Sequence, residues 1–189
     1  MRTSTVLLAV LALMIASAAT VTAQGTCPAP SGEDQWMKMW NIRVGAFVPR
    51  TQGDFKTSWN VGIEHEHPAN EIIKGLSGNF SLSADYTRFR SFNGVETRNV
   101  TLVPVYLNWK RHYMIPALEG QSWYWGFGAG LYLASADIPE MGITNQSQFA
   151  WNAGAGYYFN PSWFGEVRYL ASKEPADSRI FSLDVGYSF

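Results

Sequence analysis

The sequence predicts an all-β protein, an eight-stranded antiparallel up-and-down transmembrane β-barrel preceded by a cleaved signal peptide. Three observations lead to this prediction. An apolar segment ending in small residues opens the chain, and apolar and polar residues alternate through most of the remainder. Charged residues make up only 15% and aromatic residues another 15%, whereas a typical soluble domain is about 25% charged. Few charges and many amphipathic rings indicate a surface that does not simply face water.

Length, charge and cysteine content exclude several classes of protein. The 189 residues are enough for one domain, since a domain usually takes about 100–200. The formal net charge is −1 and the sequence has no basic block, so the electrostatic footprint of a nucleic-acid-binding protein is absent. A single cysteine excludes an internal disulfide framework and any multi-cysteine zinc site.

Residues 1–23 are predicted to be the signal peptide. Arg2 supplies the positive start, residues 6–19 form the apolar core, and residues 21–23 (Val-Thr-Ala) fit a small-residue cleavage site. The alternative is a membrane anchor, but a spanning helix needs about 20 apolar residues and this segment is shorter. The mature chain is therefore expected to start at Gln24.

Residues 24–37 are polar and proline-rich, which predicts a flexible periplasmic tail. Cys27 lies in this tail, and its surroundings fit a lipoprotein acylation site poorly. We expect an unpaired thiol, with pairing between molecules as the alternative.

Residues 38–189 are predicted to form the barrel, because alternation recurs there eight times. The predicted strands lie near residues 40–48, 58–66, 79–89, 98–109, 123–133, 149–159, 163–169 and 180–189. An even strand number and lengths of about 9–13 residues suit a closed membrane barrel, whose tilted strands need about 9–11.

Each predicted strand has an apolar face. In chain order these faces carry Ile42, Val44 and Ala46; Trp59, Val61 and Ile63; Phe80, Leu82, Ala84 and Tyr86; Val103, Val105, Leu107 and Trp109; Trp123, Trp125, Phe127, Ala129, Leu131 and Leu133; Phe149, Trp151, Ala153, Ala155, Tyr157 and Phe159; Trp163, Val167 and Tyr169; and Phe181, Leu183, Val185, Tyr187 and Phe189.

The opposite faces are polar, and six charged residues lie on them. These are Arg43, Glu64, Asp85, Glu166, Arg168 and Asp184. A lipocalin-type soluble barrel would show the same alternation with its apolar face inward. In a membrane, an Arg or Lys facing lipid near the midplane costs about 2–4 kcal/mol, so we expect these six residues to form a barrel-interior polar cluster.

Aromatic residues near the strand ends support the membrane alternative, because membrane barrels carry aromatic girdles at both interfaces. The predicted girdle consists of Trp40, Trp59, Trp109, Trp123, Trp151, Trp163, Tyr187 and Phe189. With a periplasmic N-terminus, strand direction assigns Trp59 and Trp151 to the outer rim and the other six to the inner rim.

Neighbouring strands of a closed barrel are expected to bring Arg43 near Glu166 and Arg168 near Asp184. Two interpretations of such an ion-pair cluster stay open. It can be a structural plug of mutually satisfied buried charges, or a gate or selectivity ring in a narrow pore.

Three segments carry a resemblance to a known family. They are residues 103–109 (VPVYLNW), residues 125–132 (WGFGAGLY) and the C-terminal residues 185–189 (VGYSF). With these the chain resembles the small outer-membrane β-barrels of the OmpA/OmpX/OmpW type. The resemblance implies location in the outer membrane of a Gram-negative-type bacterium, contact with outer-membrane lipids and lipopolysaccharide, and recognition of Tyr187 and Phe189 by the barrel-assembly machinery.

Other motifs are weaker. The glycines at 126, 128, 130, 154 and 156 lack the strand-to-helix turn of a nucleotide-binding loop. His65 and His67 share one side of a predicted strand, but zinc needs further ligands. His112, beside Lys110 and Arg111, is placed in a periplasmic turn without a hydrolase motif. We therefore expect no catalytic residue, no metal and no cofactor.

The sequence thus predicts a structural or surface-interaction role in the outer membrane, with a possible external ligand. The alternative is a narrow channel for small or hydrophobic solutes, and the third candidate is a lipid A-modifying enzyme, because members of the resembled family include all of these. External loops are expected near residues 49–56, 90–97, 137–147 and 172–179.

Overall fold

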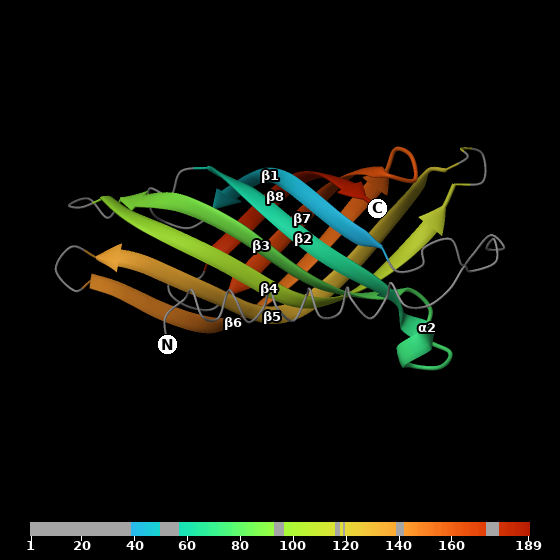
Figure 1. The fold of residues 1–189 in the computed structure, drawn as a ribbon, viewed down its shortest axis with the longest axis horizontal. Coiled ribbons are helices and arrows are strands. Elements are labelled where there is room, and N and C mark those ends of the chain that lie inside the picture. Colours follow the sequence, from blue (N-terminus) through green and yellow to red (C-terminus); the bar gives the residue numbers. More distant parts are fainter. Residues whose placement is uncertain are drawn as a thin grey trace. The chain divides into compact units, whose positions relative to one another are not determined.

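A computed structural model of the chain describes residues 39–49, 57–92, 97–115, 118, 120–138, 142–172 and 178–189. The predicted signal peptide and tail, with Cys27, lie outside this part. Eight strands form a closed barrel in chain order, each antiparallel to its neighbours (Figure 1), which confirms the predicted eight-stranded up-and-down fold. They are β1 (Trp40–Pro49), β2 (Ser58–Pro68), β3 (Asn79–Phe92), β4 (Thr97–Met114), β5 (Ser122–Ile138), β6 (Gly142–Tyr158), β7 (Trp163–Ser172) and β8 (Ser178–Ser188).

The first and last strands close the barrel. Strand β1 pairs with β8 from Asn41 opposite Ser188 to Pro49 opposite Ile180. Beyond this ladder, the amide of Trp40 donates to the carbonyl of Phe189 at 3.1 Å, and the amide of Phe189 donates back at 2.9 Å. The seam therefore leaves neither strand with an open edge along the paired segment.

The strands differ greatly in length. Strand β4 has 18 residues and β5 and β6 have 17 each, whereas β1 and β7 have 10. Pairing between β6 and β7 begins only at Ala150 opposite Ser172, so residues 142–149 of β6 pair with β5 alone within the described residues. As Figure 1 shows, β3 to β6 extend beyond the other strands at one end and form a raised wall.

Two expectations about connections are wrong. The loop expected at residues 137–147 is mostly strand, since β5 ends at Ile138 and β6 begins at Gly142. Lys110, Arg111, His112 and Tyr113 lie in β4 rather than in a periplasmic turn, and pair with β5 up to Met114 opposite Ser122. Polar residues fall on both faces at Gln146 and Ser147 of β6 and at Lys110 and Arg111 of β4, so the alternation disappears there while the backbone ladder continues.

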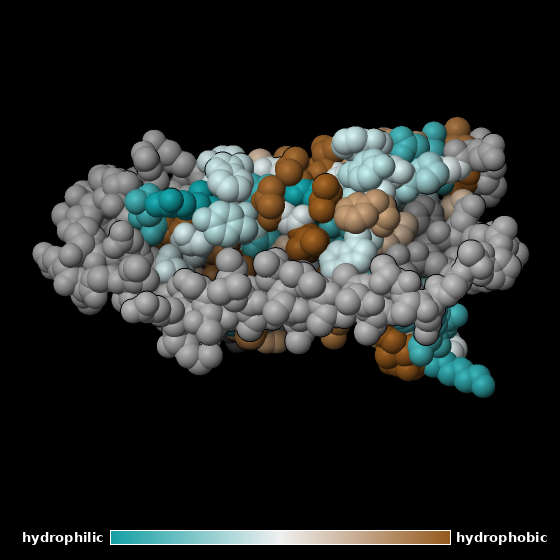
Figure 2. Space-filling model, in the orientation of Figure 1, coloured by the Kyte–Doolittle hydropathy of each residue, from teal (hydrophilic) through white to brown (hydrophobic). Residues whose placement is uncertain are grey.

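The two faces of the sheet are divided as the alternation predicts. Outward-facing apolar residues such as Val44 and Leu183 are 59% and 53% exposed, and brown apolar atoms appear on the barrel surface in Figure 2. The interior holds Arg43, Tyr106 and Tyr124 with almost no exposure. Interior glycines make room for these large groups: a Cβ added at Gly156 would overlap the Tyr124 ring.

At the rim that holds Trp40 and Phe189, the β2–β3 connection contains a single-turn helix, α2 (Ala69–Ile72). The connections at this rim otherwise run through residues 115–121 and 159–162. We call the end of the barrel that holds Trp40 and Phe189 the terminal rim, and the opposite end the distal rim. No helix in the described part of the chain is long and apolar enough to cross a membrane.

Candidate functional site

The six charged residues predicted to face inward all lie inside the barrel, and none is more than 5% exposed. Arg43 comes from β1, Glu64 from β2 and Asp85 from β3, while Glu166 and Arg168 come from β7 and Asp184 from β8. Each occupies an inward position because side chains alternate between the two faces of a strand. Three further residues, Glu66, Lys110 and His112, join them, and we call these nine residues the charged layer.

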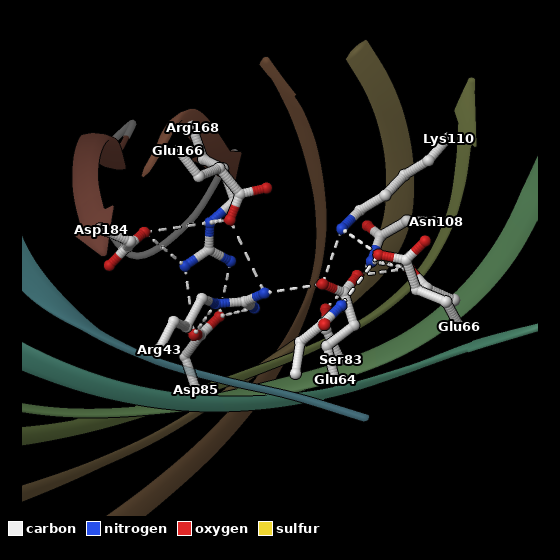
Figure 3. Close-up of polar contacts among 12 residues, drawn as sticks. Arg43, Glu64, Glu66, Ser83, Asp85, Asn108, Lys110, Glu166, Arg168 and Asp184 are labelled. Atoms are coloured by element: carbon white, nitrogen blue, oxygen red, sulfur yellow. Dashed lines mark hydrogen bonds and ion pairs between the residues drawn. The ribbon is translucent and has the colours of Figure 1, made fainter. Parts of the chain in front are cut away.

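Asp85 is the centre of one half of the charged layer. The Arg43 guanidinium binds it through Nε to Oδ1 at 2.9 Å and Nη2 to Oδ2 at 3.0 Å. Arg168 binds the same carboxylate from the other side, through Nη1 to Oδ2 at 2.7 Å and Nη2 to Oδ1 at 3.1 Å. Two forked guanidinium contacts of this kind hold β1, β3 and β7 together across the lumen (Figure 3).

Arg168 also reaches β8, as expected from the sequence. Its Nη2 lies 3.0 Å from Oδ2 of Asp184. Asp184 accepts further hydrogen bonds from Asn60 Nδ2 at 2.8 Å and Ser182 Oγ at 2.6 Å. The expected pair of Arg43 and Glu166 is longer, at 3.7 Å, and Glu166 lies closer to Arg168, at 3.2 Å.

The other half of the charged layer centres on Lys110. Its Nζ lies 2.6 Å from Oε2 of Glu64 and 3.0 Å from Oε1 of Glu66. Arg43 Nη1 contacts the same Glu64 oxygen at 3.0 Å and thereby links the two halves, as the dashed lines of Figure 3 show. His112 Nε2 lies 3.1 Å from Oε2 of Glu66.

Sequence analysis missed Glu66, Lys110 and His112 as members of this cluster. Glu66 lay at the predicted end of its strand (residues 58–66), and Lys110 and His112 were placed in a turn. The alternation of side chains between the two faces of a strand could have found them. Lys110 and His112 fall on the same face of the strand as Tyr106 and Asn108, and Glu66 falls on the same face as Glu64.

Neutral groups complete the layer. Asn108 donates to the hydroxyls of Ser81 at 3.1 Å and Ser83 at 3.0 Å, and its carbonyl accepts from Asn152 at 2.8 Å. Ser81 in turn donates to Oε1 of Glu64 at 2.5 Å. The layer encloses a cavity of about 10 Å³, room for roughly one water molecule.

We predict that Asn108→Ala lowers the free energy of unfolding by about 1–3 kcal/mol, because buried partners lose their hydrogen bonds. Denaturant titration of the refolded protein measures this loss, with Leu107→Ala as the control. Leu107 is the preceding residue and faces outward with 60% exposure. A variant as stable as the unsubstituted chain would contradict a structural role for this amide.

Apolar side chains fill the lumen on the distal side of the charged layer. Their cluster consists of Phe47, Leu102, Tyr106, Tyr132, Ala150, Leu170 and Ile180, with Ala134 packed against it. In β1, Phe47 lies further toward the distal rim than Arg43, and in β8, Ile180 lies further than Asp184. We call this the apolar plug, and it separates the charged layer from the distal end of the lumen.

The aromatic residues named for the girdle face outward. Trp59, Trp123, Trp151, Trp163, Tyr187 and Phe189 are exposed, and Trp40 and Trp109 are partly buried. Neighbours touch along the terminal rim, where the Trp163 and Tyr187 rings lie 5.2 Å apart. Toward the distal end, Trp151 and Tyr169 lie 5.5 Å apart, but Trp151 is in the middle of β6 rather than at its end.

The two histidines considered for a metal lie on the outer face of β2. The His65 ring packs against Trp40, with centroids 4.6 Å apart, and His67 Nε2 lies 3.4 Å from Oε2 of Glu71. Among the residues that the structure describes, no group of three His, Cys, Asp or Glu is arranged to hold a metal ion.

Comparison with solved structures identifies the fold. Neisserial surface protein A matches 80% of this chain and 95% of its own, with 14% identity and a TM-score of 0.61. The attachment invasion locus protein Ail of Yersinia pestis, solved with the heparin analogue sucrose octasulfate, matches 81% of this chain and 99% of its own, with 18% identity and a TM-score of 0.50. The chain has the fold of the small outer-membrane β-barrels.

This shared fold agrees with the resemblance seen in the sequence. No family model matches the chain, and no curated protein matches it. At these levels of sequence identity the proteins share a fold, and a shared fold does not determine the role of the barrel.

Proposed function

We propose that the chain is an integral protein of the outer membrane of a Gram-negative-type bacterium, with a closed lumen and a structural or surface-interaction role. The outward apolar face supports a lipid surround, because about half of the surface of Val44, Leu183 and Val185 is exposed and no described residue covers it. Lipids and lipopolysaccharide would contact this face, and Tyr187 and Phe189 would serve the barrel-assembly machinery.

One observation carries the closed lumen: the charged layer and the apolar plug are stacked along the same interior. Each charged group of the layer is bound to a partner of opposite sign, and the cavity left among them is about 10 Å³. An ion would have to break buried pairs and then cross an apolar segment, and both steps are unfavourable. This favours the plug over the gate or selectivity ring.

The raised wall of β3 to β6 supports the surface-interaction role. If the distal aromatic residues such as Trp151 mark the outer membrane interface, residues 142–148 of β6 rise beyond it. A paired sheet standing above the lipid provides an ordered platform for an external ligand.

We also propose that the chain is not an enzyme. His112 is held by Glu66 inside the charged layer, with its ring 5.1 Å from that of Tyr124. His65 and His67 face outward on β2. These placements favour structural roles over a serine–histidine pair of the kind that a lipid A-modifying hydrolase needs.

Single-channel recording tests the closed lumen. The mature protein is refolded in detergent and added to a planar bilayer. A change in its gel mobility on heating verifies that the barrel is folded. We expect no discrete current steps, and Arg168→Ala should lower stability without producing them. Steps whose size changes in Arg168→Ala or Glu166→Gln would instead establish a gated channel. A protein that stays soluble without detergent and never inserts would overturn the membrane location.

A further inference from the structure

The connection between β2 and β3 displays two isoleucines at the terminal rim. Ile72 is 60% exposed and Ile73 is 52% exposed. The turn is nevertheless ordered by its own backbone: the amide of Ala69 donates to the carbonyl of Gly78, and that of Ile73 to the carbonyl of Ala69, both at 2.8 Å. Gly75 and Gly78 have φ values of 86° and 99°, which only glycine adopts without strain. The two isoleucines are thus held outward by a defined fold of the chain.

The turn is fastened to the outside of the barrel wall rather than across the lumen. Trp109, an outward-facing residue of the aromatic girdle, donates from Nε1 to the carbonyl of Ser77 at 3.1 Å. His67, on the outer face of β2, contacts Glu71 of α2 at 3.4 Å. In Figure 1, α2 projects sideways from the strands, and in Figure 2 the same projection carries both brown and teal atoms.

Cations accompany the isoleucines. Lys74 follows Ile73 directly and is exposed. Arg111, exposed on the outer face of β4 two residues after Trp109, lies 5.4 Å from the Tyr113 ring, and that ring stacks on Trp123 at 4.4 Å. Apolar side chains beside exposed cations and aromatic rings are the composition of segments that lie in a membrane interface.

We propose that residues 69–78 form a lateral anchor in the phospholipid leaflet at the terminal rim. Ile72 and Ile73 enter the boundary of the acyl chains, and Lys74 and Arg111 contact lipid phosphates. The inference rests on the proposed membrane location. A lipid surface fits better than a periplasmic protein partner, because the turn continues the apolar outer face and is attached to its girdle through Trp109.

Spin-label accessibility tests the anchor. In a Cys27→Ser background, which removes the chain's one cysteine, single cysteines replace Ile72, Ile73, Asn70 and Val44 and carry a nitroxide. The protein is placed in nanodiscs of phosphatidylethanolamine and phosphatidylglycerol. The collision rate of each nitroxide is then measured with oxygen, which concentrates in lipid, and with a water-soluble nickel chelate.

We expect oxygen collisions to exceed nickel collisions at Ile72, Ile73 and the barrel-wall position Val44. The order should reverse at Asn70, an exposed polar residue of the same helix and therefore the matched control. If Ile72 and Ile73 behave like Asn70 while Val44 remains in lipid, the anchor is wrong and the membrane location stands. If Val44 also faces water, both proposals fail.

The cations are tested separately by Lys74→Gln combined with Arg111→Gln. Labels at Ile72 and Ile73 should become shallower, with more nickel collisions, in nanodiscs that contain phosphatidylglycerol. Unchanged depth would overturn the phosphate contacts.

Discussion

Asp85→Ala should lower the free energy of unfolding by about 3–5 kcal/mol, the usual loss when one partner of a buried ion pair is removed. Asp85 accepts four hydrogen bonds from Arg43 and Arg168. Without it both guanidiniums lose the carboxylate that they bind through two nitrogens each, and Glu166 is the remaining carboxylate near both of them. Denaturant titration of the vesicle-refolded protein, followed by tryptophan fluorescence, measures the loss.

Two further variants keep this prediction testable if the alanine variant fails to refold. Asp85→Asn preserves the shape of the side chain and removes its charge. Arg168 keeps Glu166 and Asp184 as partners in Asp85→Asn. Adding Arg168→Gln to Asp85→Asn should therefore cost less than the sum of the two single losses, because the contact between the two side chains is lost only once, and a double-mutant cycle isolates this coupling. Ser83→Ala, buried on the same strand, serves as control with an expected loss of about 1 kcal/mol. Additive effects of the Asp85 and Arg168 substitutions would argue against a shared ion-pair network.

Phe47→Ala should also be strongly destabilising. Phe47 is 1% exposed in the apolar plug, and a buried Phe→Ala substitution typically costs about 3–5 kcal/mol because a cavity remains. The same denaturant titration measures this loss. Planar-bilayer recordings of the variant should remain silent, since the charged layer still closes the lumen.

Val48→Ala is the matched control for Phe47→Ala. Val48 is the next residue and faces outward opposite Phe181. Detergent or lipid chains can fill the space that its truncation leaves, so we expect a loss below about 1.5 kcal/mol, the upper range for small aliphatic truncations. Equal losses in the two variants would contradict a plug packed more tightly than the outer surface.

The architecture was predictable because a single rule governs both faces of the barrel. Alternation at residues 180–189 assigns Leu183 outward and Asp184 inward, and the structure places both as expected. The same rule located six inward charges. It could not supply their pairing, because which carboxylate a guanidinium meets depends on the stagger of the strands and on side-chain reach across the lumen.

The alternation of apolar and polar residues also fails to predict strands where neither face of the strand is buried. Gln146, Ser147 and Gln148 of β6 place polar side chains on both faces, and the segment remains a strand because β5 pairs with it. Near the terminal rim the difficulty is the opposite one: Lys110 is buried, yet beside Arg111 it has the composition of an exposed turn. It shares the inward face of β4 with Asn108, and its contacts with Glu64 and Glu66 stabilise the buried ammonium.

The β1–β8 seam has a kinetic consequence. It joins the first and the last strand of the barrel in sequence, and the hydrogen bond from Ser188 Oγ to Asn41 Oδ1 spans 147 positions of sequence. Contacts of such high contact order form slowly, since a long loop must close before they contribute stability. Until β8 arrives, β1 and β7 each present a free edge, the feature that leads strands of different chains to aggregate. Pairing of β8, the last strand of the barrel, thus determines when these edges cease to be a target for misassembly.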